Sequence, residues 1–211
     1  MSDILIKYLT QRESSQLEFK SKIDSPFKIA RTLSAFANTA GGTLLIGIND
    51  DRTVKGCSEL EEMTKLAEAA EHLVIPPLEI RYRAIMWENR KKVLVVEIDE
   101  SSDKPHEALD EKGNRTVYVR ANDQTTPVSK EMSQILDKTD KAVESELLEQ
   151  QNVKYLMVFL KKNKRVSARE YAKLVNISEY RAKKLLETLT YEGILLMLSK
   201  QRPPQFVLKQ Q

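Results

Sequence analysis

The sequence predicts an α+β protein with a mixed-sheet N-terminal domain (residues 1–138), a helical linker (139–151) and a small C-terminal domain (152–211). Three observations predict this arrangement. A helical pattern, a glycine pair and an apolar strand follow one another between residues 25 and 51. The net charge changes sign between the two parts of the chain. The C-terminal part has the pattern of three helices followed by a β-hairpin.

The helix and strand between residues 25 and 51 form the most informative stretch. Ser25 is a favourable N-cap, and Pro26 suits the first helical position. Gly41-Gly42 would end the helix, because glycine adopts the left-handed backbone conformation readily. The apolar run that follows predicts a strand covered on both faces, in which Gly47 would let another chain segment or a ligand approach closely. Three residues of this stretch are candidates for more than packing: Asn38, Gly47 and Asp50.

The remaining elements follow from the same periodicities. Helices are expected over residues 3–11, 58–74 and 127–136, and strands over 13–20, 53–56, 79–87, 93–98 and 116–120, with a polar hairpin turn at 88–92. The N-terminal domain would then hold about five to seven strands.

Composition excludes several classes of protein. The chain has 41% apolar and 31% charged residues, as ordinary globular proteins do. No apolar run approaches the roughly 20 residues that cross a membrane, and the N-terminus lacks the features of a signal peptide. Cys57 is the single cysteine, which excludes an intrachain disulfide and favours a reducing cytoplasm. His72 and His106 are far apart in sequence, so no metal cluster built on histidine is expected.

The charge is distributed unevenly. Residues 1–151 carry 21 Lys and Arg against 27 Asp and Glu, a net −6, whereas residues 152–211 carry 13 against 4, a net +9. The basic C-terminal part is therefore a candidate for binding nucleic acid. The alternative is a solvated basic face without a partner.

The C-terminal part has the element order of a winged helix-turn-helix domain. Ser167-Ala-Arg-Glu170 is a capping box at the start of the second helix, and Asn176-Ile177-Ser178 is a tight turn before the third. The third helix of such domains reads the major groove, and the tip of the hairpin meets phosphates. The candidate DNA contacts are Tyr180, Arg181, Lys183 and Lys184 on that helix and Lys200 and Arg202 at the tip.

Four segments of the N-terminal domain resemble one known family. They are Leu17-Glu-Phe-Lys20, the run Phe36-Ala-Asn-Thr-Ala-Gly-Gly42 continuing to Asp50, Lys104-Pro105, and Tyr118-Val-Arg120. In this order they resemble the Schlafen-type AlbA domain, over about residues 12–138. This AlbA-like domain is common in bacterial proteins described as DNA-binding regulators or ATP-binding proteins, and the C-terminal part is similar to the winged-helix-type domains that often follow it.

The resemblance implies two functions. Many bacterial members resemble DNA-binding transcriptional regulators, which is our leading expectation. The Schlafen branch proper contains endoribonucleases with three carboxylates, whose spacing Glu13, Glu18 and Asp50 share. Mg²⁺ or Mn²⁺ prefers such oxygen ligands and would polarise the phosphodiester of an RNA substrate. From the residues alone, Glu18 could instead pair with Lys20 or Arg120, and Glu13 could cap a turn.

The resemblance also bears on partners and cofactors. The Schlafen nucleases use a doubled domain that forms a basic groove, and here a homodimer would have to supply the second copy. Lys20 and Arg120 are the candidates for contacting nucleic acid in the N-terminal domain. ATP is a candidate ligand only because some members of the family are described as ATP-binding. The sequence itself has no P-loop, since Gly41-Gly42 is not followed by Lys-Ser or Lys-Thr. A ligand-sensing interaction module remains a further interpretation.

Overall fold

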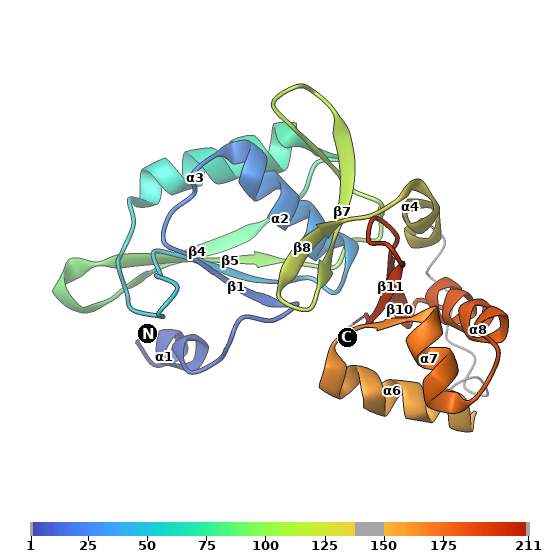
Figure 1. The fold of residues 1–211 in the computed structure, drawn as a ribbon. Helices are drawn as coiled ribbons and strands as arrows, with labels where there is room; N and C mark the ends of the chain where they lie inside the picture. The colour runs from blue at the N-terminus through green and yellow to red at the C-terminus, as the bar shows by residue number, and fades with distance from the viewer. Residues whose placement is uncertain (1, 138–149, 210–211) are drawn as a thin grey trace. The chain divides into compact units, whose positions relative to one another are not determined.

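The computed structural model describes residues 2–137 and 150–209 (Figure 1). The chain divides into two compact units, Met1–Thr125 and Thr126–Gln211, and each is described by itself. Most of the expected linker lies outside the described residues. Helix α4 (Lys130–Leu136), which the sequence analysis placed in the N-terminal domain, groups with the second unit.

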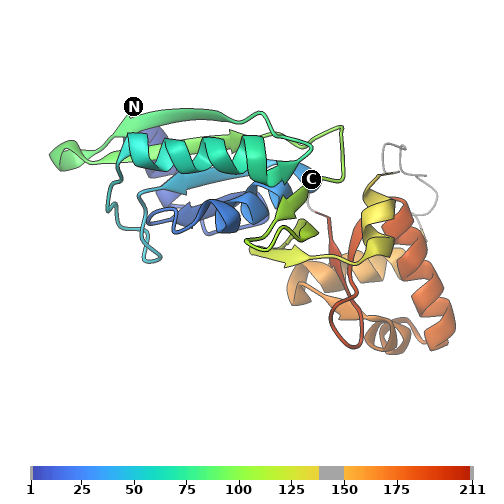
Figure 2. The same cartoon turned by 90° about the horizontal axis from the view of Figure 1, so that it is seen from above.

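The first unit contains a four-stranded sheet with two covered faces. Its strand order is β1-β2-β5-β4, and only the β1–β2 pair is parallel. The strands are β1 (Leu17–Lys20), β2 (Gly42–Ile46), β4 (Arg81–Met86) and β5 (Lys92–Ile98). Helix α1 (Ser2–Leu9) covers one face, while α2 (Pro26–Asn38) and α3 (Glu59–Glu68) cover the other (Figures 1 and 2).

A second sheet of the first unit packs against α2. Its order is β3-β6-β7-β8, from Val74–Ile75, Glu107–Leu109, Arg115–Ala121 and Gln124–Pro127. Helix α2 contacts β6 and β7 on one side and the first sheet on the other. Its residues from Ile29 to Asn38 are therefore buried, with the single exception of Arg31.

Apolar side chains fill both faces of the first sheet. On the α2 side, Leu33 and Phe36 join Leu44 of β2 and Val96 of β5 in one core. On the α1 side, Leu5 packs with residues of β1, β2 and β5. The expected strand covered on both faces is confirmed for β2, whose last three residues are buried.

The glycines after α2 are required by close approaches of the backbone. Gly41 has φ +64°, and a Cβ there would lie 2.6 Å from the Ile98 carbonyl oxygen. Gly47 has φ +102°, and a Cβ there would lie 3.1 Å from backbone atoms of Gly56 and Lys92. Gly47 was expected to let either another chain segment or a ligand approach closely, and in the structure it is a chain segment that does so.

The second unit follows the order that the sequence predicted. After α4 come α6 (Gln151–Asn163), β9 (Val166–Ser167), α7 (Ala168–Val175), α8 (Glu179–Tyr191), β10 (Leu195–Leu198) and β11 (Gln205–Leu208). The three strands form an antiparallel sheet in the order β10-β11-β9. A separate core holds them together, with Leu156, Tyr171, Leu186 and Phe206 at its centre.

Several local expectations were wrong. The described residues as far as Pro127 contain eight strands, more than the five to seven expected. The two-residue β3 and the polar β8 carry too little sequence pattern to be recognised. The helix expected over 58–74 changes at Ala69–Leu73 to a π-helix, η1.

Candidate nucleic-acid interface

Glu18 lies in a buried ion pair. Its Oε2 accepts a hydrogen bond from Nη1 of Arg120, and its Oε1 lies 2.6 Å from Nζ of Lys20. Both pairings that the sequence analysis considered are therefore formed. The register of β1 explains the burial, since Glu18 pairs with Leu44 and points to the α2 side of the sheet. Its carboxylate is committed to two cations of its own chain.

Arg120 is held entirely inside the first unit. It is 1% exposed, and its Nη atoms also donate to Thr125 Oγ1 (3.0 Å) and to the carbonyl oxygens of Ser14 (2.9 Å) and Asp123 (3.2 Å). The guanidinium lies 4.7 Å from the centre of the Phe36 ring. Arg120 was expected to contact nucleic acid, but in this position it is inaccessible to a phosphate. Lys20, the other candidate, is engaged with Glu18.

Glu13 and Asp50 do not complete a metal site with Glu18. Glu13 Oε1 accepts a hydrogen bond of 2.7 Å from the amide of Phe19 in β1, which is a local structural role but not the cap of a turn that was considered. Asp50 is exposed in the turn after β2, where the Arg52 amide donates to Asn49. Throughout residues 2–137 and 150–209, no three His, Cys, Asp or Glu side chains are placed to hold a metal ion. The residues therefore do not fit the Mg²⁺ or Mn²⁺ that the nuclease reading requires.

Asn38 has a structural role. It is completely buried, and its Nδ2 donates to the carbonyl oxygens of His106 (2.8 Å) and Tyr118 (2.9 Å) while its Oδ1 accepts from the His106 amide (2.7 Å). The side chain thereby joins the end of α2 to the second sheet. Asn38, a candidate for a functional contact, therefore has the role of linking α2 to the second sheet through hydrogen bonds.

His106 is buried beside Asn38. Its ring nitrogens lie 2.7 Å from the Pro76 carbonyl oxygen and 2.7 Å from Ser101 Oγ. Burial lowers the pKa of His106 below its ordinary value, because the charged imidazolium would lose its hydration. The imidazole is therefore a neutral part of the fold.

The second unit exposes a helix that is joined to its predecessor by a tight turn. Helix α7 begins at the predicted capping box, in which Ser167 and Glu170 each accept from the other's backbone amide. It ends at Asn176, which is left-handed at φ 52°, and Ser178 then caps α8 by accepting from the Arg181 amide at 3.3 Å. Three residues thus turn the chain between α7 and α8, as in a helix-turn-helix.

The outward face of α8 carries basic and aromatic side chains. Ala182, Leu186 and Leu189 face the core, which turns Tyr180 and Lys184 to the opposite side. Tyr180 is 76% exposed, and Tyr191, which lies on the same outward stripe at the end of α8, is 63% exposed. The sequence analysis missed Tyr191; its helical spacing from Tyr180 and Lys184 was the available signal.

The hairpin of β10 and β11 presents two further cations. Lys200 and Arg202 are both exposed in the turn between these strands. On α8, Lys183 lies 3.7 Å from Glu187, one turn further along. No ion pair within the described part of the chain engages Arg181, Lys184, Lys200 or Arg202, so these cations are open to an external anion.

Comparison with protein families identifies the first unit. A model of the family described as Schlafen, AlbA_2 matches residues 13–129. The chain belongs to the Schlafen AlbA_2 family. This membership confirms the resemblance read from the sequence and suggests a role in nucleic-acid binding. The matched range contains β1 to β8, with Glu18, Asn38 and Arg120.

Other comparisons add less to the AlbA_2 assignment. No curated protein matches the chain. Among solved structures, the chain is similar to the DIP2311 protein from Corynebacterium diphtheriae, with 16% identity and a TM-score of 0.41. The match covers 61% of this chain and 31% of that one, so this chain spans about a third of that protein. None of the described helices of this AlbA_2 protein has the length and apolar character to traverse a bilayer.

Proposed function

We propose that this AlbA_2 protein is a DNA-binding transcriptional regulator whose second unit binds duplex DNA as a winged helix-turn-helix. The observation that supports the proposal is the exposed basic face of α8, directly after a three-residue turn from α7. A helix of this kind enters the major groove with its first residues against base edges. Tyr180 and Arg181 occupy that position in α8.

The electrostatics of the second unit support the same role. Residues 152–211 carry 13 basic against 4 acidic side chains. Lys183 and Lys184 flank the groove-facing residues, and Lys200 and Arg202 extend the basic surface along the hairpin. Cations at such positions neutralise phosphates and release counterions, which makes binding depend steeply on salt.

A salt titration with matched variants tests the proposal. The chain offers two pairs of adjacent, exposed lysines on helices of the same unit: Lys183 and Lys184 on α8, and Lys161 and Lys162 on α6. Reversing either pair to Glu changes the net charge equally. Binding to a random duplex is measured between low and moderate salt for both variants and the unmodified chain.

In the α8 variant the plot of log K against log salt should become shallower, with the magnitude of its negative slope reduced by about 2. Each lost phosphate contact reduces that magnitude by about 0.9. The α6 variant should keep the slope. A further reversal at Lys200 should weaken binding again. Equal loss in both pairs would mean that net charge alone drives binding, and binding unchanged by reversal of the α8 pair and Lys200 would refute the assignment.

A further inference from the structure

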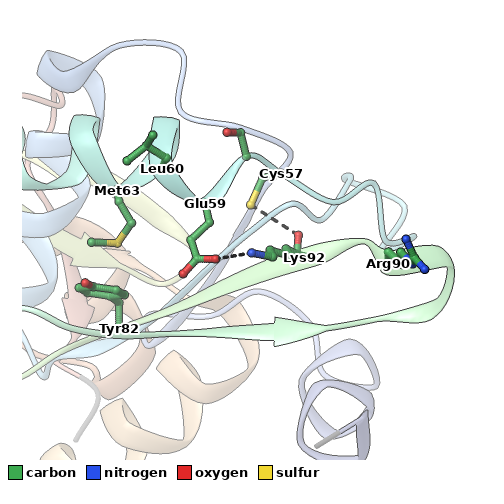
Figure 3. Close-up of a pocket in the computed structure, with 8 residues that line it drawn as sticks. Cys57, Glu59, Leu60, Met63, Tyr82, Arg90 and Lys92 are labelled. Atoms are coloured by element: carbon green, nitrogen blue, oxygen red, sulfur yellow. Dashed lines mark hydrogen bonds and ion pairs between the residues drawn. The ribbon is translucent and has the colours of Figure 1, made fainter.

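An open apolar groove runs between α3 and the edge strand β4. Two adjoining hollows of about 670 Å³ and 720 Å³ share Met63 and Tyr82 in their walls. Leu60 and Met63 of α3 stand over Tyr82 of β4 (Figure 3). In the walls of this groove Leu60 is 80% exposed and Tyr82 50%, which is unusual exposure for neighbouring large apolar side chains. Met86, further along β4 and outside the lining of the two hollows, is 51% exposed.

Strand β4 also has an open edge. It ends the sheet order β1-β2-β5-β4, and its described backbone pairs with β5 alone. An edge of this kind can accept another strand. Tyr82, Ala84 and Met86 share the α3 side of β4, because alternate residues of a strand face the same way.

The charges along the groove differ between its two ends. One end carries Glu71 and Glu79, and the other carries Arg90 and Lys92. Within the described residues, no ion pair engages Glu71, Glu79 or Arg90, whereas Lys92 pairs with Glu59 at 2.6 Å. If the groove of a second copy of the chain lay antiparallel to the first, the acidic end of each would meet the basic end of the other. A parallel arrangement would bring two ends of the same charge together.

We propose that this groove is a dimer interface, in which β4 of two copies of the chain pair antiparallel about a two-fold axis at Ala84. This register sets Tyr82 of each copy opposite Met86 of the other on the α3 side. A register centred on Arg83 would instead oppose two like charges, and one centred on Ile85 would set Tyr82 against Glu88. The two α3 helices add Leu60 and Met63 to the buried surface.

The interface is tested by the association state of the full chain. Sedimentation velocity over a concentration series should show a dimer. Met86→Lys or Tyr82→Glu alone should weaken the dimer by about tenfold or more, because each sets two charges against apolar side chains. The double variant Tyr82→Glu with Met86→Lys should restore the dimer, since each introduced acid then faces an introduced base.

The control is Tyr155→Glu on α6, a tyrosine of similar exposure at 55%, which should leave the dimer intact. Because the three substituted residues are about half exposed, the variants should fold, and circular dichroism checks this. A chain that stays monomeric at its highest soluble concentration overturns the proposal. So does a dimer that neither single substitution weakens. This inference is independent of DNA binding, which the salt titration measures separately.

Discussion

Asn38 and His106 exchange two hydrogen bonds across 68 positions of sequence, through the Asn38 side chain and the His106 backbone. The Asn38 side chain therefore bonds the backbone of His106 through both a donor and an acceptor, as a neighbouring β-strand would. Because the pair is buried, its loss would leave the backbone groups of His106 and Tyr118 without partners.

Replacing Asn38 with Ala should lower the free energy of unfolding of the first unit by about 3 kcal/mol or more, since each unpaired buried group costs about 1–3 kcal/mol. The matched control is Asn49→Ala, which removes a side-chain amide that donates to Thr53 Oγ1 in an exposed turn and should cost about 0.5 kcal/mol. Urea unfolding followed by Trp87, the single tryptophan, reports on this unit. If Asn38→Ala and Asn49→Ala lowered the free energy of unfolding equally, the proposed role of Asn38 in linking α2 to the second sheet would be contradicted.

Replacing either Glu18 or Arg120 with Met should destabilise the first unit by about 3–5 kcal/mol. Glu18→Met leaves the buried Arg120 without its carboxylate, and Arg120→Met leaves the buried Glu18 with the partly exposed Lys20. The double variant should be less destabilised than either single one. The same urea assay measures this non-additivity. Additive losses would show that the two side chains act separately.

Structured RNA incubated with Mn²⁺ should give the same result for the unmodified chain and for Asp50→Ala. Asp50 is exposed in a turn, and Glu18 is neutralised by Arg120 and Lys20. Any cleavage should therefore not depend on Asp50. Cleavage that disappears in a folded Asp50→Ala variant would revive the three-carboxylate site.

Gly47 and Gly113 both have positive φ, at +102° and +79°, but only Gly47 is crowded. Gly113→Ala should cost about 1 kcal/mol from backbone conformation alone. Gly47→Ala should cost about 1–3 kcal/mol more, because its Cβ would press on the backbone of Gly56 and Lys92. Urea midpoints compare the two, and similar values would mean that the neighbouring segment yields easily.

Acidification should destabilise the first unit through His106. Its pKa is lowered by burial, so between pH 6.5 and that lower pKa the unfolded chain binds a proton that the folded chain does not. Stability should fall below pH 6.5 by at most about 1.4 kcal/mol per pH unit. Carboxyl groups such as Asp110, whose pKa is lowered from 3.8, act below this window.

His106→Gln should flatten this dependence between pH 7.5 and pH 5.5, although the variant will be less stable throughout. The matched variant is His72→Gln, which removes the other, exposed histidine. If the two variants behave alike, the proton uptake belongs elsewhere.

Much of the fold could be predicted because its signals are local. Pro26 at the start of α2, the left-handed Gly41 after this helix and the capping box at Ser167 can be recognised from a few neighbouring residues, although the Ser25 side chain makes no capping hydrogen bond. The role of Asn38 could not be predicted in this way, since its partners His106 and Tyr118 lie 68 and 80 positions away. The pairing of Arg120 with Glu18, 102 positions apart, was one of two alternatives that the residues left open. Three acids with a suggestive spacing were likewise insufficient, because strand register decides where their side chains point.

The buried pair of Glu18 and Arg120 also constrains how this sequence can change. Loss of either charge alone should carry a large penalty in stability, whereas a joint exchange for two apolar residues should cost less. Among related sequences the two positions should therefore vary together. A designer who reshapes this unit should treat strands β1 and β7 as one unit of substitution, even though roughly half the chain separates them.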